Sequence, residues 1–254
     1  MANQPTRILS TRPLEAALLE QAAGRGILID TLSFIATEPL VDETLQSRIR
    51  DLAQHCLVAV FTSMNAVEAV ASILGLQPDG VIPRWQIFSI GYATQQLVRQ
   101  YWGERSLAGT AASASALADT ILSKWKDGIR EEGIKKATGM PREVTFFCGD
   151  QRREDLPEKL RGQGVGVNEV IVYNTIRTPH KVAQTYDGIV FFSPSAVHSF
   201  FLENSIPAST LLFAIGQTTA DTIRTYTLNR TLLSGSPEKE ALIQQVIDYY
   251  NFNK

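Results

Sequence analysis

Short apolar runs alternate with longer amphipathic segments along most of this chain. The apolar runs, which we expect to form strands, cover residues 58–62, 85–90, 144–148, 187–192 and 211–215. The segments with helical spacing of apolar residues, which we expect to form helices, cover 66–74, 94–101, 114–126, 156–161, 220–226 and 239–250. Nearly continuous apolar strands that alternate with helices are typical of parallel sheets covered on both faces. The pattern therefore predicts an α/β protein.

The chain also contains an internal repeat. Its first block shares an arginine, two glycines and a proline at a constant offset of 140 residues: Arg12, Gly24, Gly26 and Pro39 in one copy, and Arg152, Gly164, Gly166 and Pro179 in the other. Two later blocks follow in the same order, with 61–67 recurring as 191–197 and 90–94 recurring as 215–219. A repeat of this length predicts a duplicated α/β unit, and two similar lobes that face one cleft. The charged, glycine-rich stretch 127–143 is expected to be a connector or a mobile loop.

Charge and targeting signals narrow the class of protein. The net charge of -2 argues against a nonspecific nucleic-acid binder, because such proteins gather Lys and Arg into patches. No apolar run is long enough to span a bilayer, and residues 1–5 lack the apolar segment of a secretory signal. We therefore expect a cytoplasmic protein. Cys56 and Cys148 lie far apart and outside any CxxC motif, so we expect two reduced core residues and neither a disulfide nor a zinc site.

Small and polar residues follow the predicted strands. The four turns cover 63–66, 91–94, 193–196 and 216–219. In open α/β sheets, ligands bind beyond the carboxyl ends of the strands, where the first N–H groups of the helices are unpaired and favour anions. Alternatively, Asn65, Ser195 and Thr218 are ordinary helix caps that need no ligand. Recurrence of the same turn in both copies favours a binding role.

The common catalytic motifs are missing from the sequence. There is no HExxH, Walker A or GxSxG motif, and the three histidines are widely spaced. Residues 162–166 follow a predicted helix, so their glycines indicate a helix end and not a dinucleotide fingerprint. His198 is expected to be a packing or surface histidine. The sequence predicts neither a metal site nor a cofactor.

Several segments together resemble the uroporphyrinogen-III synthase family. They are Thr-Arg-Pro at 11–13, Phe-Thr-Ser-x-Asn-Ala-Val at 61–67, Val-Tyr-Asn-Thr at 172–175, Phe-Ser-Pro-Ser-Ala-Val at 192–197 and Ala-Ile-Gly-x-Thr-Thr-Ala at 214–220. The resemblance runs over residues 7–246. It implies two Rossmann- or flavodoxin-like lobes, one built from 1–36 and 176–254 and the other from 37–175, whereas the repeat alone suggests sequential domains. The crossings would lie at 34–38 and 173–178 as a two-stranded ribbon hinge, with the active-site cleft between the lobes.

The resemblance also implies an activity, that of a monomeric lyase of porphyrin and haem biosynthesis. Such an enzyme cyclises hydroxymethylbilane, a linear tetrapyrrole polycarboxylate, to uroporphyrinogen III with loss of water and inversion of ring D. It needs no cofactor, nucleic acid or membrane partner. Tyr173 matches the family's tyrosine and would donate a proton to the leaving hydroxyl, although it could instead only pack at the hinge. The residues that would bind the substrate are Arg12, Ser63, Asn65, Ala66, Gly91, Thr94, Ser193, Ser195, Ala196, Gly216, Thr218 and Thr219, and for Arg12 a surface salt bridge is the alternative.

Two other functions remain open from the residues alone. One is a two-lobed, hinge-type binding protein for a small anionic ligand, against which the missing secretory signal argues. The other is an enzyme that binds a nucleotide or a sugar phosphate, for which no glycine-rich phosphate loop is present.

Overall fold

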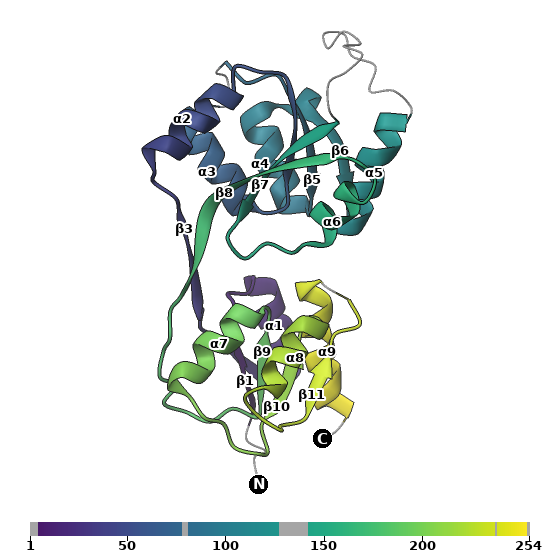
Figure 1. Ribbon diagram of the computed structural model, residues 1–254. Coiled ribbons are helices and arrows are strands. Elements are labelled where there is room, and N and C mark those ends of the chain that lie inside the picture. Colours follow the sequence, from purple (N-terminus) through teal and green to yellow (C-terminus); the bar gives the residue numbers. More distant parts are fainter. Residues whose placement is uncertain (1–4, 78–80, 127–141, 237, 253–254) are drawn as a thin grey trace. The chain divides into compact units, whose positions relative to one another are not determined.

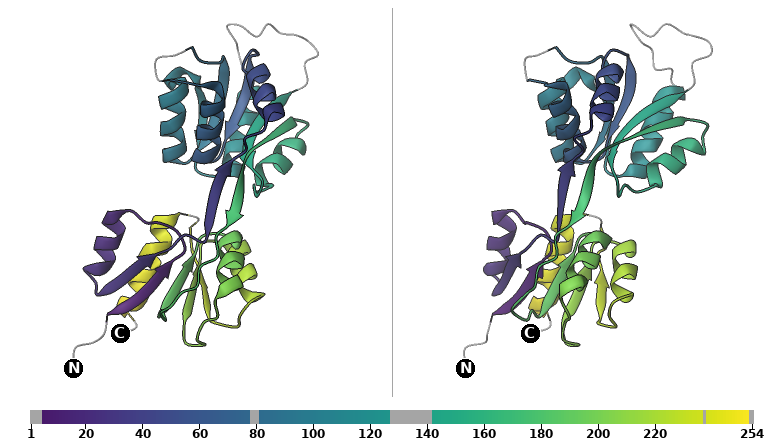
Figure 2. Two further views of the ribbon diagram at one scale, coloured as in Figure 1. Left: turned by 90° about the vertical axis from the view of Figure 1, so that its left-hand side faces the viewer. Right: turned by 60° about the vertical axis from the view of Figure 1, so that its left-hand side comes forward.

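A computed structural model describes residues 5–77, 81–126, 142–236 and 238–252. Contacts between Cα atoms group the chain into two compact units. The terminal unit consists of Met1–Ala36 and Ile176–Lys254, and the middle unit consists of Thr37–Thr175. Each contains one sheet with helices packed on it (Figures 1 and 2). Most of the predicted connector at 127–143 lies outside the described residues.

The terminal unit is built from both ends of the chain. Its elements are β1 (Thr6–Ser10), α1 (Ala16–Ala23), β2 (Ile27–Thr31), β9 (Gly188–Phe191), α7 (Pro194–Glu203), β10 (Leu211–Ala214), α8 (Gln217–Arg224), β11 (Thr231–Leu233) and α9 (Lys239–Phe252). The strand order is β11-β10-β9-β1-β2, and all neighbouring pairs are parallel. The carboxyl ends of these strands therefore lie at one edge of the sheet.

The middle unit repeats this plan. Its elements are β3 (Ile35–Pro39), α2 (Glu43–Leu52), β4 (Leu57–Phe61), α3 (Met64–Leu74), β5 (Trp85–Ile90), α4 (Tyr92–Trp102), the 3-10 helix η1 (Glu104–Ser106), β6 (Leu107–Ala111), α5 (Ala114–Lys126), β7 (Glu143–Gly149), α6 (Asp155–Arg161) and β8 (Gly166–Arg177). The strand order is β3-β8-β7-β4-β5-β6, with parallel pairing from β8 to β6.

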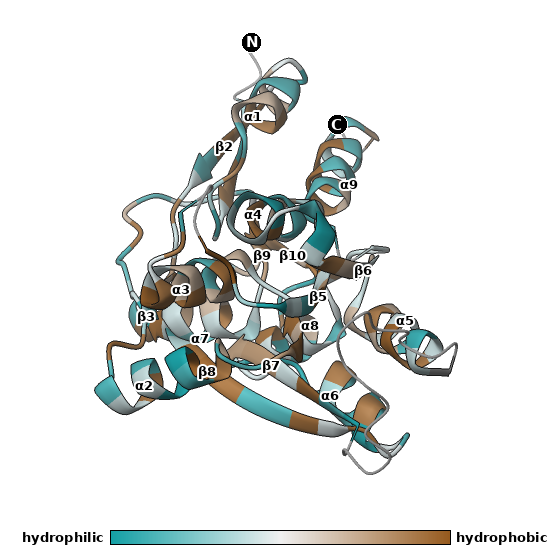
Figure 3. Ribbon diagram, turned by 90° about the horizontal axis from the view of Figure 1, so that it is seen from above, coloured by the Kyte–Doolittle hydropathy of each residue, from teal (hydrophilic) through white to brown (hydrophobic). Residues whose placement is uncertain are grey.

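Strands β3 and β8 are where the chain passes from one unit to the other. Leu40 N donates to Val172 O at 2.9 Å, and Thr178 N donates to Phe34 O at 3.0 Å, so the two strands run in opposite directions. Figure 1 shows them side by side. β8 is also the longest strand that the structure describes, and bands of opposite hydropathy alternate along it in Figure 3. That alternation is typical of a strand that, along part of its length, packs against the core with one face and exposes the other face.

The apolar strands face helices on both sides. In β1, Ile8 belongs to the cluster that packs under α9, whereas its neighbour Leu9 belongs to the cluster under α7. In β4, Val60 and Phe61 likewise face opposite clusters. Successive side chains of a strand point to opposite faces, so a strand covered on both sides must be apolar throughout. This is why the sequence shows unbroken apolar runs, and the predicted α/β class is confirmed.

Predicted helix starts differ from the observed ones by a few residues. Helices α3 and α4 each begin two residues before the predicted start, and α8 begins three residues before it. Apolar periodicity detects the buried face of a helix, whereas its first turn at a strand end is polar and small. None of the helices in the described part of the chain combines the length and apolar character needed to cross a bilayer.

The two cysteines differ in their surroundings. Cys148 is a buried core residue whose Sγ lies 3.9 Å from Val170 O, and burial raises its pKa to about 12. Cys56 is exposed, so the prediction that both are core residues is wrong for Cys56. It lies in the turn just before β4, where the chain has not yet entered the sheet.

In the structure, the first block of the internal repeat aligns differently from the alignment that the sequence suggests. Gly26 N donates to Ala23 O in the turn after α1, and Gly164 N donates to Arg161 O in the turn after α6. These two glycines have φ of 72° and 74°, a left-handed conformation that glycine adopts without strain. Gly26 is therefore equivalent to Gly164, two residues away from the match to Gly166 that the offset of 140 suggests. The later blocks keep the register seen in the sequence, with Ser63 equivalent to Ser193 and Gly91 to Gly216 as helix caps.

Candidate functional site

Two equivalent serines cap helices at strand ends. Ser63 follows β4, and its Oγ accepts from Ala66 N at 3.3 Å at the start of α3. Ser193 follows β9, and its Oγ accepts from Ala196 N at 3.1 Å at the start of α7. Both serines have extended backbones and make the same cap. Each of the duplicated units thus has the same serine cap at the carboxyl end of a strand of its sheet.

Two equivalent glycines begin the neighbouring helices without a side-chain cap. Gly91 precedes α4 and Gly216 precedes α8, and within the described residues no side chain caps either helix. The first intrahelical bonds run from Gln95 N to Gly91 O and from Ala220 N to Gly216 O. The N–H groups of 92–94 and 217–219 precede those bonds, so they are the donors that a helix start leaves open to a ligand.

The remaining predicted binding residues lie in the first turns of these helices. Asn65 and Ser195 are half-buried, and Thr218 is exposed. None of the three is the cap residue that the sequence suggested, because each cap lies two residues earlier. The side chains of four others pack inward, and these are Ala66, Thr94, Ala196 and Thr219. These four residues can therefore contact a ligand mainly through their backbone N–H groups. The N–H groups of Ala66 and Ala196 already donate to the capping serines.

A β-bulge determines the direction of Tyr173. Along β8, Ile171 pairs with Cys148, but the next pair joins Tyr173 to Gly149, so the register shifts by one residue. Val172 is buried in the cluster under α3, and Tyr173 packs against the same cluster. In a regular strand these neighbours would point to opposite faces, and a bulge is the usual way to redirect a side chain beside an active site. The phenol consequently lies on the face of the sheet that α3 covers.

This placement brings Tyr173 to Ser63. The two residues are more than a hundred positions apart in the sequence, and the Ser63 hydroxyl is near enough to influence the pKa of the phenol. The phenol is half-buried, and burial raises its pKa, while the nearby Ser63 hydroxyl acts in the opposite direction and the charge of Asp150 adds to the rise. A phenol whose pKa lies above its ordinary value near 10 keeps its proton throughout the neutral range. Tyr173 can therefore act as a proton donor.

Comparison with known proteins assigns the chain to a family. A family model described as uroporphyrinogen-III synthase HemD matches residues 16–244. The chain belongs to the uroporphyrinogen-III synthase family. It is accordingly an enzyme of tetrapyrrole biosynthesis of the lyase class.

Individual relatives agree with this assignment. The uroporphyrinogen-III synthase of Saccharomyces cerevisiae is 26% identical over 218 residues, which cover 77% of this chain and 76% of the yeast protein. The crystal structure of uroporphyrinogen-III synthetase from Helicobacter pylori has a TM-score of 0.58 at 14% identity and covers 96% of this chain and 99% of the other. A mutant uroporphyrinogen III synthase from Thermus thermophilus has a TM-score of 0.56 at 15% identity, with coverage of 98% and 100%. At such identities the two structures show a shared fold.

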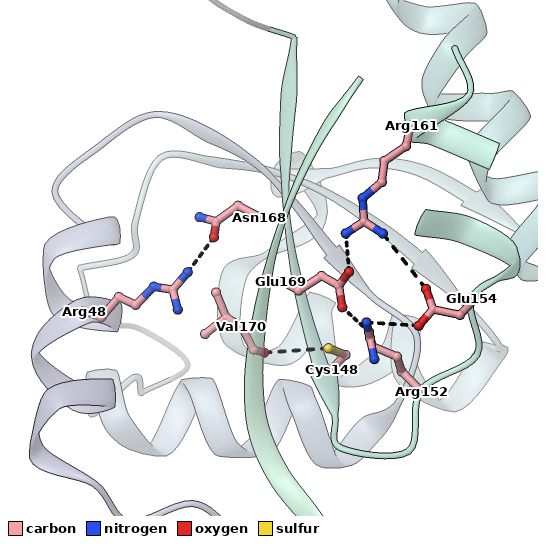
Figure 4. A network of polar contacts seen from close by, with 8 residues as sticks. All are labelled: Arg48, Cys148, Arg152, Glu154, Arg161, Asn168, Glu169 and Val170. Atoms are coloured by element: carbon pink, nitrogen blue, oxygen red, sulfur yellow. Dashed lines mark hydrogen bonds and ion pairs between the residues drawn. The ribbon is translucent and has the colours of Figure 1, made fainter. Parts of the chain in front are cut away.

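The two repeat-related arginines of this synthase family member have different surroundings. Arg12 is exposed in the segment between β1 and α1, and its guanidinium makes no hydrogen bond or ion pair with the residues that the structure describes. Arg152 forms ion pairs with Glu169 and, at 3.0 Å, with Glu154, and Arg161 joins the same carboxylates (Figure 4). Of the two, only Arg12 is available to a carboxylate ligand. Arg152 instead ties the start of α6 to β8.

Sequence reasoning missed two residues beside Tyr173. Gly149 ends β7, and a Cβ built on it would lie 2.5 Å from two carbons of the Tyr173 ring. Asp150 follows directly, and its Oδ1 accepts from Thr175 N at 2.8 Å while its own N–H donates to Tyr173 O at 3.1 Å. The only local signal is a Gly-Asp pair after a buried strand, which is typical of a turn. The packing expected for His198 agrees with its hydrogen-bond contact of 2.7 Å between Nδ1 and the Tyr226 hydroxyl.

Proposed function

We propose that this chain converts hydroxymethylbilane into uroporphyrinogen III, with loss of water and inversion of ring D. The observation that carries the proposal is the half-buried phenol of Tyr173, turned by a β-bulge to the face that α3 covers, in a member of this synthase family. Ligands of open α/β sheets bind at that edge. The chemistry requires one proton donor there, and the environment of Tyr173 keeps it protonated.

In the proposed reaction, Tyr173 donates its proton to the hydroxyl on ring A as the carbon–oxygen bond breaks. Water leaves, and the electron pair of the pyrrole nitrogen stabilises the resulting azafulvene cation. Ring D then attacks the cation to give a spiro intermediate, which fragments and recloses with ring D inverted; the proton lost from the new ring junction restores the phenol. The same precursor closes to the uninverted isomer I without an enzyme. The protein must therefore both assist departure of the hydroxyl and hold the chain in position.

The open helix starts are the proposed binding groups for the carboxylates of the substrate. Helices α4 and α8 present uncapped N–H groups, and each helix dipole contributes about 0.3–1 kcal/mol to binding of an anion. Thr94 and Thr219 would act through their N–H groups, whereas Thr218 can also use its exposed hydroxyl. Helices α3 and α7 contribute less on this account, because serine already caps them.

Arg12 is the proposed cationic contact. Because the Arg12 guanidinium makes no hydrogen bond or ion pair within the described residues, it can bind a carboxylate through two parallel hydrogen bonds. Arg12 and α8 belong to the terminal unit, and Tyr173 and α4 belong to the middle unit. Substitutions in each unit therefore test the part of that unit in substrate binding separately.

Incubation with freshly prepared hydroxymethylbilane tests the function. The products are oxidised and the uroporphyrin isomers are separated by chromatography. We expect mostly isomer III, and we expect the Tyr173→Phe variant to give mostly isomer I. If the folded wild-type protein gives only isomer I at the spontaneous rate, the synthase proposal is wrong, and a two-lobed binding protein for a small anion becomes the better interpretation.

We also propose that the enzyme acts as a monomer in the cytoplasm, as the sequence suggests. Sedimentation equilibrium at several protein concentrations tests the first part, and a mass that rises toward that of a dimer would contradict it. Fractionation of cells that produce the protein tests the second.

A further inference from the structure

We propose that Arg152 is a positioning residue for Tyr173, because its ion pair with Glu169 holds the β-bulge of β8 in the register that turns the phenol toward α3. The effect of Arg152 on turnover rests on the proposed function of Tyr173. The contacts that hold the bulge do not depend on that function.

The β-bulge decides on which face of the sheet the phenol lies. Glu169 pairs with Phe146, which belongs to the apolar cluster under α5 and α6, whereas Val170 belongs to the cluster under α3. In a regular strand every second residue shares a face, so Tyr173 would lie on the same side as Glu169. The extra residue Val172 reverses this, and the phenol packs against the cluster under α3. The direction of the phenol therefore depends on this one-residue shift.

The turn after β7 contacts β8 on both sides of the bulge. Arg152 in this turn forms an ion pair with Glu169, which precedes the bulge. Asp150 donates its N–H to Tyr173 O at 3.1 Å and accepts from Thr175 N at 2.8 Å, after the bulge. One short segment thus binds β8 before and after the extra residue. The bulge cannot move or straighten without breaking one of these two sets of contacts.

The guanidinium of Arg152 is itself held in place. It also forms an ion pair with Glu154 at 3.0 Å, and Arg161 of α6 approaches the same two carboxylates (Figure 4). The side chains of Arg152 and Glu169 are 23% and 15% exposed, so water screens their attraction less than that of an exposed pair. A planar guanidinium can hold two carboxylates at fixed angles, which the ammonium group of lysine cannot do. The cluster therefore attaches the turn to β8 in a defined geometry.

Two neighbouring arginines separate positioning from stability. Arg161 binds the same carboxylates as Arg152, but it lies at the end of α6 and outside the turn. Arg153 lies in the turn and pairs with Asp155 at 2.7 Å, but its side chain is 79% exposed. Positioning predicts a marked effect on turnover for Arg152 alone. A general loss of stability predicts similar effects for Arg152 and Arg161.

The experiment is a double-mutant cycle on kcat for isomer III. Arg152→Gln should lower kcat of the folded protein roughly tenfold with little change in KM, because a displaced catalytic group slows the chemical step. In the Tyr173→Phe background, Arg152→Gln should change kcat less than about twofold, because it acts through the phenol. Arg152→Lys keeps the charge and should recover part of the rate. Arg161→Gln and Arg153→Gln should stay within about twofold of the wild-type kcat.

A readout that needs no activity accompanies the cycle. Nuclear magnetic resonance follows protein labelled at the tyrosine Cζ carbon, and Tyr173→Phe identifies the signal of Tyr173. Burial raises the pKa of this phenol, so a phenol released from the α3 face should ionise nearer to its ordinary value. Arg152→Gln should therefore move ionisation of Tyr173 to lower pH, whereas Arg161→Gln should leave it in place.

The possible outcomes separate the two proposals. If the wild-type protein makes no isomer III but Arg152→Gln moves the titration of Tyr173, the synthase proposal fails and the positioning of the ring stands. If isomer III forms and the effects of Arg152→Gln and Tyr173→Phe on kcat multiply, the positioning role is wrong. Equal losses of kcat in Arg152→Gln and Arg161→Gln, or an unshifted titration in Arg152→Gln, also overturn it. Arg152→Lys, with the same expected directions, replaces Arg152→Gln in every measurement if the latter does not fold.

Discussion

The ring of Tyr173 occupies the space that a side chain at Gly149 would fill. These residues are paired across β7 and β8 just after the β-bulge, and a Cβ on Gly149 would lie 2.5 Å from the ring carbons. Glycine at this position is thus a steric condition for the direction of the phenol. Its backbone is in an ordinary strand, so the requirement comes from the neighbour and not from φ.

Gly149→Ala should therefore displace the phenol and lower kcat on the order of tenfold or more, with a loss of about 1–3 kcal/mol in the free energy of unfolding. The matched control is Gly109→Ala, where a Cβ would lie 2.7 Å from the ring of Phe88 in the same unit. That variant should lose similar stability, measured by denaturant unfolding, while its folded fraction keeps the wild-type kcat. Equal effects of both variants on kcat would mean that the loss is only structural.

Tyr173→Phe removes one hydroxyl and leaves the ring in place. We expect kcat for isomer III to fall on the order of a hundredfold, because a general acid contributes about that factor or more. The free energy of unfolding should change by less than about 1.5 kcal/mol, since at most the contribution of one hydroxyl is lost and the ring keeps its packing. Assays that are stopped at set times and followed by isomer analysis measure kcat. A rate equal to that of the wild type would remove the acid role and leave a packing role for the ring.

Asp150 should matter as an acceptor and not as a charge. Its Oδ1 accepts from Thr175 N, so Asp150→Ala leaves that donor without its partner and loosens β8 beside the phenol. We expect kcat to fall several-fold in Asp150→Ala, in line with the net contribution of about 0.5–1.5 kcal/mol of a typical hydrogen bond. Asp150→Asn keeps an acceptor of the same shape and should remain close to the wild type. If Asp150→Asn is as slow as Asp150→Ala, the negative charge itself is required.

The two arginines should separate binding from stability. Arg12→Gln should raise KM for hydroxymethylbilane roughly tenfold without changing the free energy of unfolding, because the guanidinium has no hydrogen-bonding partner within the described residues. Arg152→Gln should do the reverse and cost about 1.5–3 kcal/mol of stability, because Glu169 and Glu154 each lose one of two ion-pair partners and keep only Arg161. Initial rates and urea unfolding distinguish the two effects. An increase in KM for Arg152→Gln alone would show that the repeat-related arginine binds substrate instead.

Acid should weaken the middle unit through Glu169. Burial alone would raise the pKa of this carboxyl, but hydrogen bonds from Arg152 and Arg161 outweigh it and hold the pKa below its ordinary value. The folded pKa is thus lower than the unfolded one, so the stabilisation is complete above the unfolded value and disappears as pH falls through the folded value. Glu169→Gln should be less stable than the wild type at pH 7, and the difference should shrink below about pH 4.5. A difference that stays constant down to pH 3 would contradict this account.

Local sequence determined many of the elements and the turns between them. Apolar runs and helical spacing are visible within a few residues, and so are the small, polar turns at the starts of α3, α4, α7 and α8, although the capping residues of α3, α7 and α8 lie two residues before those that the sequence suggested. The direct equivalence of Ser63 with Ser193 and of Gly91 with Gly216 was readable as a repeat. These features depend on the backbone and side chains of neighbouring residues, and for that reason pattern and propensity suffice to predict them.

Only the tertiary structure decided which of these residues meet. Tyr173, Gly149 and Ser63 lie together because β8, β7 and β4 are adjacent strands, and a one-residue bulge turns the phenol toward α3. Strand order and register depend on long-range pairing, which no local pattern encodes. Dependence on long-range contacts also explains why the sequence did not predict the roles of the arginines or the equivalence of Gly26 with Gly164. Arg12 and Arg152 look alike in the repeat, but the glutamates that surround Arg152 come from the approach to α6 and from a distant strand.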